Sequence, residues 1–340
     1  MFKLRSLIIA VVIAATAGLF YWALFVPKED VSQRIYQTLK EQENRADLSF
    51  KQVTFEESSG GQKYWQLAAE VAIVNKSTGL ATLQVTQGLF FKNGKPVMKF
   101  RSPAALWDMR KKEIYLDKPL GYDVGSEKQI AALLPALGTQ AASVFTLPPV
   151  YQKGSGYWFR AKNLSWKVAD QMLVCTGGIV LNKGEVTGYA DQLEGDVELK
   201  KVLLSGAPRV VIAPAQGSPV TVEADQFELD SVANVLIARG NPVVTWRASR
   251  VTAQTASYFQ TDKKIKLAGD VKVAYEDINA WGNAADYLTN KQFVVLSGEA
   301  RAEQGDSRLS SNKVMVSLKD RKISLLGKSQ VVIPAGEAAP

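Results

Sequence analysis

The chain contains no histidine and a single cysteine, Cys175, among its 340 residues. Without histidine, the common serine–histidine and cysteine–histidine catalytic pairs are excluded. One cysteine excludes an intramolecular disulfide and a cysteine-based metal cluster. No glycine-rich phosphate loop follows a strand and opens a helix, and the acidic residues are scattered. We therefore expect a protein that is not an enzyme, with no catalytic residues, no cofactor and no metal site.

The chain also lacks any basic run interleaved with aromatic residues, which argues against a nucleic-acid partner. Its net charge is +8, and Lys3 and Arg5 precede the first apolar run, which leaves +6 beyond that run. Excess positive charge keeps a protein soluble, and it also suits an anionic partner such as a lipid phosphate or a membrane surface. Both interpretations stay open.

Residues 7–26 form an apolar run without a charged residue. In a helix this length spans about 30 Å, the thickness of one hydrocarbon core. The basic residues before it predict a cytoplasmic N-terminus and an inner-membrane, single-pass protein whose bulk is periplasmic. A signal peptide cleaved after residues 15–17 is the alternative, but the apolar run continues beyond that site. We expect residues 1–27 to hold the anchor and residues 28–48 to form a juxtamembrane segment with a short helix.

A frame of about 29 residues recurs along the C-terminal half of the chain. Apolar or small residues fall at positions +3, +5, +12, +14, +18 and +20, and glycine falls at +16. Six copies begin at Ala161, Ala190, Ala224, Ala253, Gly282 and Ser311. One step is 34 residues long because residues 213–219 add loop. A fixed period of this length indicates a repeat architecture.

Each copy is predicted to form two strands with one buried face, because its apolar positions step by two. The polar stretch between them suits a hairpin. The +16 glycine is expected within a strand on the inward face, where it marks a bend, a bulge or a close approach. An ordinary turn glycine is the alternative, which the continuing apolar pattern disfavours. The polar residue at +1 is expected to face outward.

The N-terminal half follows the same frame with less fidelity. Its two units place the following residues inward: Ala72, Val74, Leu83, Val85, Leu89, Phe91, Ala105, Trp107, Ile114, Leu116, Leu120 and Tyr122. The chain then holds about eight units and on the order of sixteen strands. With one polar and one apolar face per strand, antiparallel pairing is favoured. The fold class is all-β: an N-terminal transmembrane helix followed by repeated antiparallel hairpins in an open, twisted, solenoid-like β-jelly-roll.

The frame is interrupted once, which predicts two lobes. Residues 49–125 form the first β lobe and residues 157–333 the second. Residues 126–156 between them contain an apolar stretch and turn-forming residues, and read as a linker or insertion. Residues 334–340 are expected to be a disordered tail.

The predicted function depends on the interior of the sheet. A fully closed sheet makes the inward positions a plain core, whereas a sheet open along one side makes them an apolar groove. A groove suits acyl chains, because each buried CH₂ contributes about 0.8 kcal/mol. The end strands offer unpaired backbone groups to an edge strand of another protein. The lipid-groove candidates are Phe91, Trp107, Leu164, Trp166, Phe227, Leu229, Tyr258, Ile265, Leu267, Val271, Tyr287, Leu296 and Ile323.

Two known families share these patterns. The repeats "EADQFELDSVANVLIARGNPVV", "AQTASYFQTDKKIKLAGDVKV" and "KVMVSLKDRKISLLGKSQVVI" resemble the lipopolysaccharide-transport protein LptA and the OstA-type domain. Residues 64–124, behind a single anchor, resemble LptC. The resemblance implies twisted open jelly-rolls with an acyl-binding groove. It implies an anchored component of a lipopolysaccharide bridge, which receives its cargo from an inner-membrane transporter complex and passes it toward the outer membrane.

The partners implied are therefore lipopolysaccharide, the inner-membrane lipid-export transporter complex, and an LptA-like or outer-membrane bridge protein joined by edge-strand pairing. Two other functions stay open at this point. One is a closed β-solenoid that acts as an envelope assembly scaffold. The other is a bridge for another lipid, such as phospholipid.

Overall fold

The computed structural model describes residues 31–42, 48–124, 156–214, 218–289 and 291–333. Within these ranges the chain forms one helix and an antiparallel sheet of 23 strands. No helix of this described part is long and apolar enough to cross a membrane. The predicted anchor, nearly all of the predicted insertion and the predicted tail lie outside the described residues.

The elements have these bounds: α2 (Val31–Gln42), β1 (Leu48–Ser59), β2 (Gln62–Asn75), β3 (Leu80–Lys92), β4 (Lys95–Asp108), β5 (Glu113–Asp117), β6 (Leu120–Asp123), β7 (Tyr157–Arg160), β8 (Asn163–Lys167), β9 (Met172–Lys183), β10 (Val186–Asp196), β11 (Lys201–Ser205), β12 (Arg209–Ile212), β13 (Val220–Glu223), β14 (Gln226–Asp230), β15 (Val235–Arg239), β16 (Val243–Trp246), β17 (Ser249–Thr252), β18 (Thr255–Phe259), β19 (Lys264–Tyr275), β20 (Ile278–Leu288), β21 (Phe293–Gln304), β22 (Ser307–Ser317) and β23 (Lys322–Val332).

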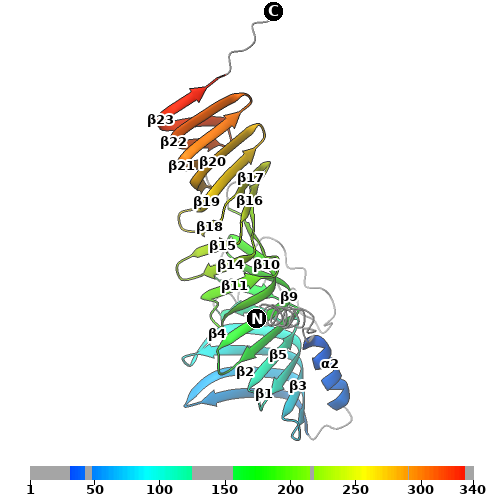
Figure 1. The fold of residues 1–340 in the computed structure, drawn as a ribbon. Helices are drawn as coiled ribbons and strands as arrows, with labels where there is room; N and C mark the ends of the chain where they lie inside the picture. Colours follow the sequence, from blue (N-terminus) through cyan, green and yellow to red (C-terminus); the bar gives the residue numbers. More distant parts are fainter. Residues whose placement is uncertain (1–30, 43–47, 125–155, 215–217, 290, 334–340) are drawn as a thin grey trace, which may run out of the picture.

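The strands stack into one long column (Figure 1). Strand β1 lies at the end beside α2, and β23 lies at the opposite end. Among the described strands, β1 pairs with β2 alone and β23 with β22 alone, so both are edge strands. The prediction of repeated antiparallel hairpins is confirmed.

The sheet is folded lengthwise into two walls that meet at a corner. The first wall contains β5, β8, β11, β14, β15 and β18, together with the adjoining halves of the longer strands. The second wall contains β6, β7, β12, β13, β16 and β17, with the other halves. The corner divides several predicted strands into two, which is why there are 23 strands and not about sixteen.

The frame glycines form this corner, and the prediction that they lie on the inward face is wrong. At Gly269 the backbone φ is +79°, a conformation that residues with a Cβ rarely adopt. The register shifts here, since Ala268 pairs with Ala284 and Val271 with Gly282. The +1 residue Gln254 lies over the glycine, where a Cβ would be 2.4 Å from its Oε1. The predicted bend or bulge is therefore real, and the +1 side chain covers it.

All six frame glycines share this left-handed conformation: Gly177, Gly206, Gly240, Gly269, Gly298 and Gly327.

In the two N-terminal units the corner reverses the alternation of faces. Successive inward residues across a regular corner are Leu267 and Val271, four positions apart. In the unit before the predicted insertion they are Leu116 and Gly121, five positions apart. An odd step moves the next residues to the opposite face, because side chains alternate along a strand.

For this reason, several residues that were predicted to face the interior do not face it. In the unit that ends at β6, Leu120 and Tyr122 form an outer-face cluster with Trp158 and Val180. In the first unit Val85 is an exposed corner residue with φ +49°. After it, Phe90 enters the interior in place of the predicted Leu89 and Phe91.

The predicted division into two lobes does not appear as a break in the sheet. Strand β5 pairs with β8 and β6 with β7, so strands from both sides of the predicted insertion are direct neighbours. One hydrophobic cluster also extends across this boundary.

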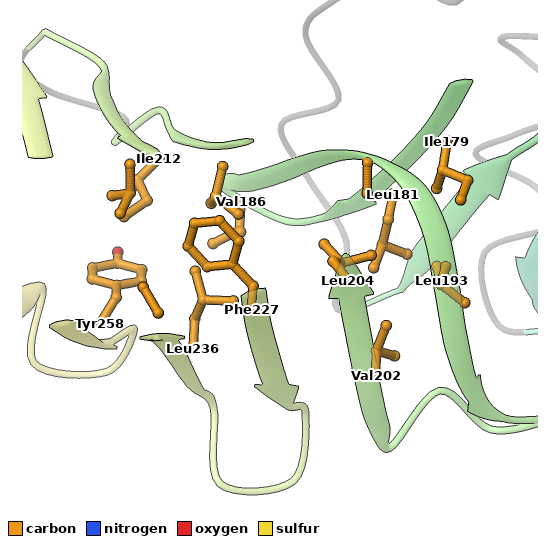
Figure 2. Close-up of a cluster of buried hydrophobic side chains, with 14 of the residues drawn as sticks. Ile179, Leu181, Val186, Leu193, Val202, Leu204, Ile212, Phe227, Leu236 and Tyr258 are labelled. Atoms are coloured by element: carbon orange, nitrogen blue, oxygen red, sulfur yellow. The ribbon is translucent and has the colours of Figure 1, made fainter. Parts of the chain in front are cut away.

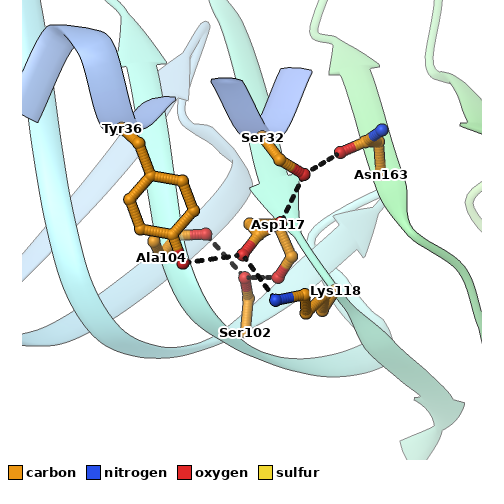
Figure 3. Close-up of polar contacts among 7 residues, drawn as sticks. All are labelled: Ser32, Tyr36, Ser102, Ala104, Asp117, Lys118 and Asn163. Carbon is orange, nitrogen blue, oxygen red and sulfur yellow. Dashed lines mark hydrogen bonds and ion pairs between the residues drawn. The ribbon is translucent and has the colours of Figure 1, made fainter. Parts of the chain in front are cut away.

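The predicted short helix after the anchor is present as α2, on the outer face of β3, β4 and β5. Ile35 is buried there against Ala104 and Leu106. Ser32 Oγ lies 2.6 Å from Asp117 Oδ1 of β5 and 2.9 Å from Asn163 Oδ1 of β8 (Figure 3). The helix therefore contacts the two strands that join the N-terminal units to the later ones.

Candidate functional site

The interior of the first wall is an unbroken row of cross-strand neighbours from β1 to β23. Each member pairs with the next, and the row runs Leu48, Val74, Ala81, Trp107, Ile114, Trp166, Leu173, Gly195, Val202, Leu229, Leu236, Tyr258, Ile265, Tyr287, Val294, Val316 and Ile323. At about 4.8 Å per strand the row is roughly 75 Å long. It contains no charged side chain.

The second wall faces this row with one of its own. Its members are Phe55, Leu67, Gly88, Phe100, Gly121, Phe159, Leu181, Gly188, Val210, Val222, Val244, Val251, Val273, Ala280, Ala302, Leu309 and Val331. Figure 2 shows Phe227 and Tyr258 of the first wall directed toward Val186 and Ile212 of the second. The two walls enclose one continuous apolar interior.

Twelve of the thirteen predicted candidates line or border this interior. Nine are buried within the cluster: Leu164, Trp166, Phe227, Tyr258, Ile265, Leu267, Val271, Tyr287 and Leu296. Trp107, Leu229 and Ile323 are partly buried against it. Phe91 is the exception, because it is half-buried below Lys63 Nζ, 5.7 Å from its ring centroid, and Phe90 takes the inward place. Their burial places them inside, and their contact with lipid remains a prediction.

The sequence reasoning missed much of the second wall. Phe159 is fully buried there, and its ring lies across Gly121, where a Cβ would be 2.3 Å from the ring. Trp246 is also buried, with its ring centroid 6.5 Å from that of Tyr287. The frame stopped at position +20, so it did not include Trp246. Side chains at every second position of a strand lie on the same face, and this alternation around Phe159 could have identified it as an interior residue.

Five interior side chains carry a polar atom without a hydrogen-bond partner among the described residues. They are the indole nitrogens of Trp107 and Trp166 and the hydroxyls of Tyr157, Tyr258 and Tyr287. Burial raises the pKa of Tyr258, and the nearby Glu185 raises it further. Burial also raises the pKa of Tyr287, although Arg247 opposes this shift. Both phenols are therefore protonated hydrogen-bond donors at neutral pH.

Polar contacts join the two walls on the side opposite the corner, and we call this line of contacts the seam. Lys263 of the first wall forms an ion pair with Glu185 of the second. Lys183 Nζ donates to the Ser231 carbonyl at 2.9 Å. Tyr275 donates its hydroxyl hydrogen to the Leu318 carbonyl, also at 2.9 Å.

Further ion pairs cross the seam at both ends of the column. They join Glu57 to Lys112, Lys92 to Asp196 and Glu198, and Glu276 to Arg321. These contacts close the interior laterally, and among the described residues no backbone hydrogen bond joins the tips of the two walls.

Cys175 is fully buried in the hydrophobic cluster, and burial raises the pKa of its thiol, so it is a packed core residue. Within the described ranges no three histidine, cysteine, aspartate or glutamate residues form a group that could hold a metal ion.

An open notch of about 790 Å³ lies on the corner near Gly206 and Gly240, and none of the predicted candidates lines it.

Comparison with known proteins finds similarity in the later repeats. Residues 221–322 match the protein-family model described as LptA/(LptD N-terminal domain) LPS transport protein. The lipopolysaccharide export system protein LptA of Escherichia coli K12 is 26% identical over 133 residues, which cover 36% of this chain and 72% of that protein. LptA of Shigella flexneri matches at the same identity and coverage.

A solved structure is also similar over part of the chain. It is the crystal structure of LptH, described as the LptA-homologous periplasmic component of the conserved lipopolysaccharide transport device from Pseudomonas aeruginosa. It aligns at 20% sequence identity with a TM-score of 0.32, over 35% of this chain and 96% of that chain. The family match over residues 221–322 and the similarity to LptA of Escherichia coli support an LptA-like lipopolysaccharide-transport domain in the C-terminal half.

Proposed function

We propose that this chain is a periplasmic component of a lipopolysaccharide transport bridge, anchored in the inner membrane through residues 7–26. The acyl chains of the lipid lie in the interior between the two walls and move along it toward the outer membrane. The observation that carries this proposal is the apolar row that runs from Leu48 at one edge of the sheet to Ile323 at the other. The similarity of residues 221–322 to lipopolysaccharide-transport domains supports it.

We infer the direction of transport from the position of α2, the element that follows the proposed anchor in the chain. Residues 7–26 precede α2, and α2 lies at the β1 end. We infer that this LptC-like end receives lipid from an inner-membrane export complex. The β23 end then passes lipid to an LptA-like or outer-membrane bridge protein, through backbone pairing of edge strands. The chain acts as a conduit, and no enzymatic step is part of this role.

The seam determines how the lipid enters the interior. Its contacts are side-chain ion pairs and isolated hydrogen bonds, which break more readily than a backbone ladder. We propose that the lipid headgroup stays outside the seam while the acyl chains pass between the walls. The cationic seam residues Lys183 and Lys263 would then lie beside an anionic headgroup.

The seam also favours a second candidate function. If its contacts never open, the interior is a dry core and the protein is a closed β-solenoid scaffold for envelope assembly. A bridge for another lipid, such as phospholipid, is a variant of the first proposal.

Mass spectrometry of the lipid that co-purifies with the full-length chain distinguishes these functions. The protein is extracted from its own membranes in mild detergent, and its lipid is compared with the total lipid of the same extract. Enrichment of lipopolysaccharide supports the proposal, and enrichment of phospholipid supports the other bridge. A protein that carries no lipid supports the scaffold.

A further inference from the structure

Two tyrosine hydroxyls inside the column are buried without a hydrogen-bond partner. Tyr258 and Tyr287 are 3% and 2% exposed, and neither hydroxyl has a partner among the described residues. Such a group destabilises the protein relative to a hydrogen-bonded one, because it has lost its bonds to water. Phenylalanine fits the same space without this cost, so packing alone does not account for either hydroxyl.

The two tyrosines form a pair on the first wall. Tyr258 and Tyr287 both pair with Ile265, which lies between them in the interior row. They are thus two strands apart, at about 10 Å along the column. Apolar neighbours surround them, since Leu236 and Val294 flank the pair in the same row.

Both hydroxyls lie on the side of the interior where the seam closes it. Beyond the effect of burial, Glu185, a seam residue held by Lys263, raises the pKa of Tyr258 through its charge and through a polar contact with the hydroxyl, but this contact lies outside hydrogen-bond geometry. Arg247, in the loop at the tip of the second wall, acts on Tyr287. Each acyl chain is linked to the lipid headgroup. When the chain enters through the seam, this linkage would pass close to the two tyrosine hydroxyls. The linkage of an acyl chain is an ester or an amide, and its carbonyl oxygen is a hydrogen-bond acceptor.

We propose that the Tyr258 and Tyr287 hydroxyls donate hydrogen bonds to the carbonyl oxygens of ester- or amide-linked acyl chains. This inference rests on the proposed function and adds a selectivity to it. The interior would favour acyl lipids over ether-linked or purely hydrocarbon chains of the same length. The two residues act as specificity determinants within a conduit that is otherwise apolar.

Two lipids that differ only in the linkage provide the test. Full-length protein is titrated with ester-linked diacyl phosphatidylglycerol and with its ether-linked dialkyl analogue, and each displaces a fluorescent anthroyloxy-stearate probe. The wild-type protein is expected to bind the ester lipid more tightly, by about 2–10-fold for each hydrogen bond. The Tyr258→Phe/Tyr287→Phe double variant should bind both lipids with the affinity of the wild type for the ether lipid.

Tyr275→Phe is the matched control, because the Tyr275 hydroxyl already donates to the Leu318 carbonyl. This variant should keep the ester preference. Without lipid, the double variant should melt at the wild-type temperature or above it, whereas Tyr275→Phe should melt lower.

Equal affinity of the wild type for the two lipids would overturn the inference and leave the proposed function standing. An ester preference that survives in the double variant would also overturn it. If the wild type binds neither lipid, the inference fails, and the mass spectrometry of the co-purified lipid decides the proposed function separately.

Discussion

Asp225 lies directly over the backbone of Gly240, so that a Cβ on this glycine would be 2.1 Å from Asp225 Oδ2. The two residues occupy positions +1 and +16 of one repeat, and they meet where the first wall turns into the second. The contact explains why the frame carries a glycine at +16, since the backbone φ of +81° and the close approach both exclude a side chain.

Replacement of this glycine should loosen the corner. Gly240→Ala combines a strained backbone with a clash, and it should cost about 1–3 kcal/mol in local stability. Hydrogen exchange of β14 and β15, together with the thermal midpoint, measures the loss. Gly94→Ala is the control, because Gly94 also has a positive φ, +71°, but nothing lies within 4 Å of a Cβ there. If the two variants lose the same stability, the close approach of Asp225 does not contribute to the loss of stability in Gly240→Ala.

The Lys263–Glu185 pair should govern how fast lipid enters. Glu185→Gln removes one charge of a partly exposed pair, so the stability should change by less than about 1 kcal/mol. Uptake of a fluorescent acyl probe should become faster, because the walls separate more easily. Glu228→Gln serves as the control, since the Glu228–Arg239 pair joins β14 to β15 within the first wall. Equal uptake by both variants would show that the seam is not the route.

Stability should vary with pH only at the extremes. Burial raises the pKa of Glu198, but Lys92 and Lys200 outweigh burial and hold the pKa below the ordinary 4.5. The resulting stabilisation is present above pH 4.5 and is lost as the pH falls through the lower folded-state pKa. The hydrogen bond from Lys92 to Glu198 raises the pKa of Lys92 above 10.5, so its contribution is lost only in strong alkali.

No histidine titrates between these limits. The thermal midpoint should therefore be nearly constant from pH 6 to pH 9 and fall below pH 5. Glu198→Gln should reduce the slope of the acid limb. A large change of the midpoint near pH 7 would contradict this account.

The exposed edge at the C-terminal end should carry the contact with the next bridge protein. Leu326, Val331 and Val332 of β23 are about half exposed, which is unusual for apolar residues of an edge strand. Leu326→Lys with Val332→Lys should abolish end-to-end association, measured by cross-linking and size-exclusion chromatography, and leave lipid binding intact, because neither residue belongs to the interior rows. Val232→Lys, at a hairpin tip, is the control. Unchanged association would place the contact elsewhere.

Much of this fold follows from the sequence, because apolar residues at every second position report which face of a strand is buried. In the regular repeats the pattern correctly predicted Leu267 and Leu296 as interior. It failed at Phe91 and at Leu120, where a corner of different length reverses the faces. The geometry of a corner depends on the backbone conformation there. The sequence indicates that conformation only where a glycine occupies the corner.

The closing contacts were not predictable in the same way. Glu185 and Lys263 are separated by 78 positions and meet only because the sheet folds lengthwise. Asp117, buried beneath α2, likewise shows no signal in its own strand that a helix covers it. Such contacts depend on how the walls and the helix are arranged, and a local pattern carries no information about that.

Site-specific photocrosslinking in living cells tests the central claim most directly. A photoreactive residue at Leu267 points into the interior, and one at the adjacent Lys266 points out from the same strand. We expect a lipopolysaccharide adduct from Leu267 and none from Lys266. If Leu267, Tyr258 and the other interior positions give no lipid adduct in protein that is folded and membrane-bound, the interior does not carry lipid.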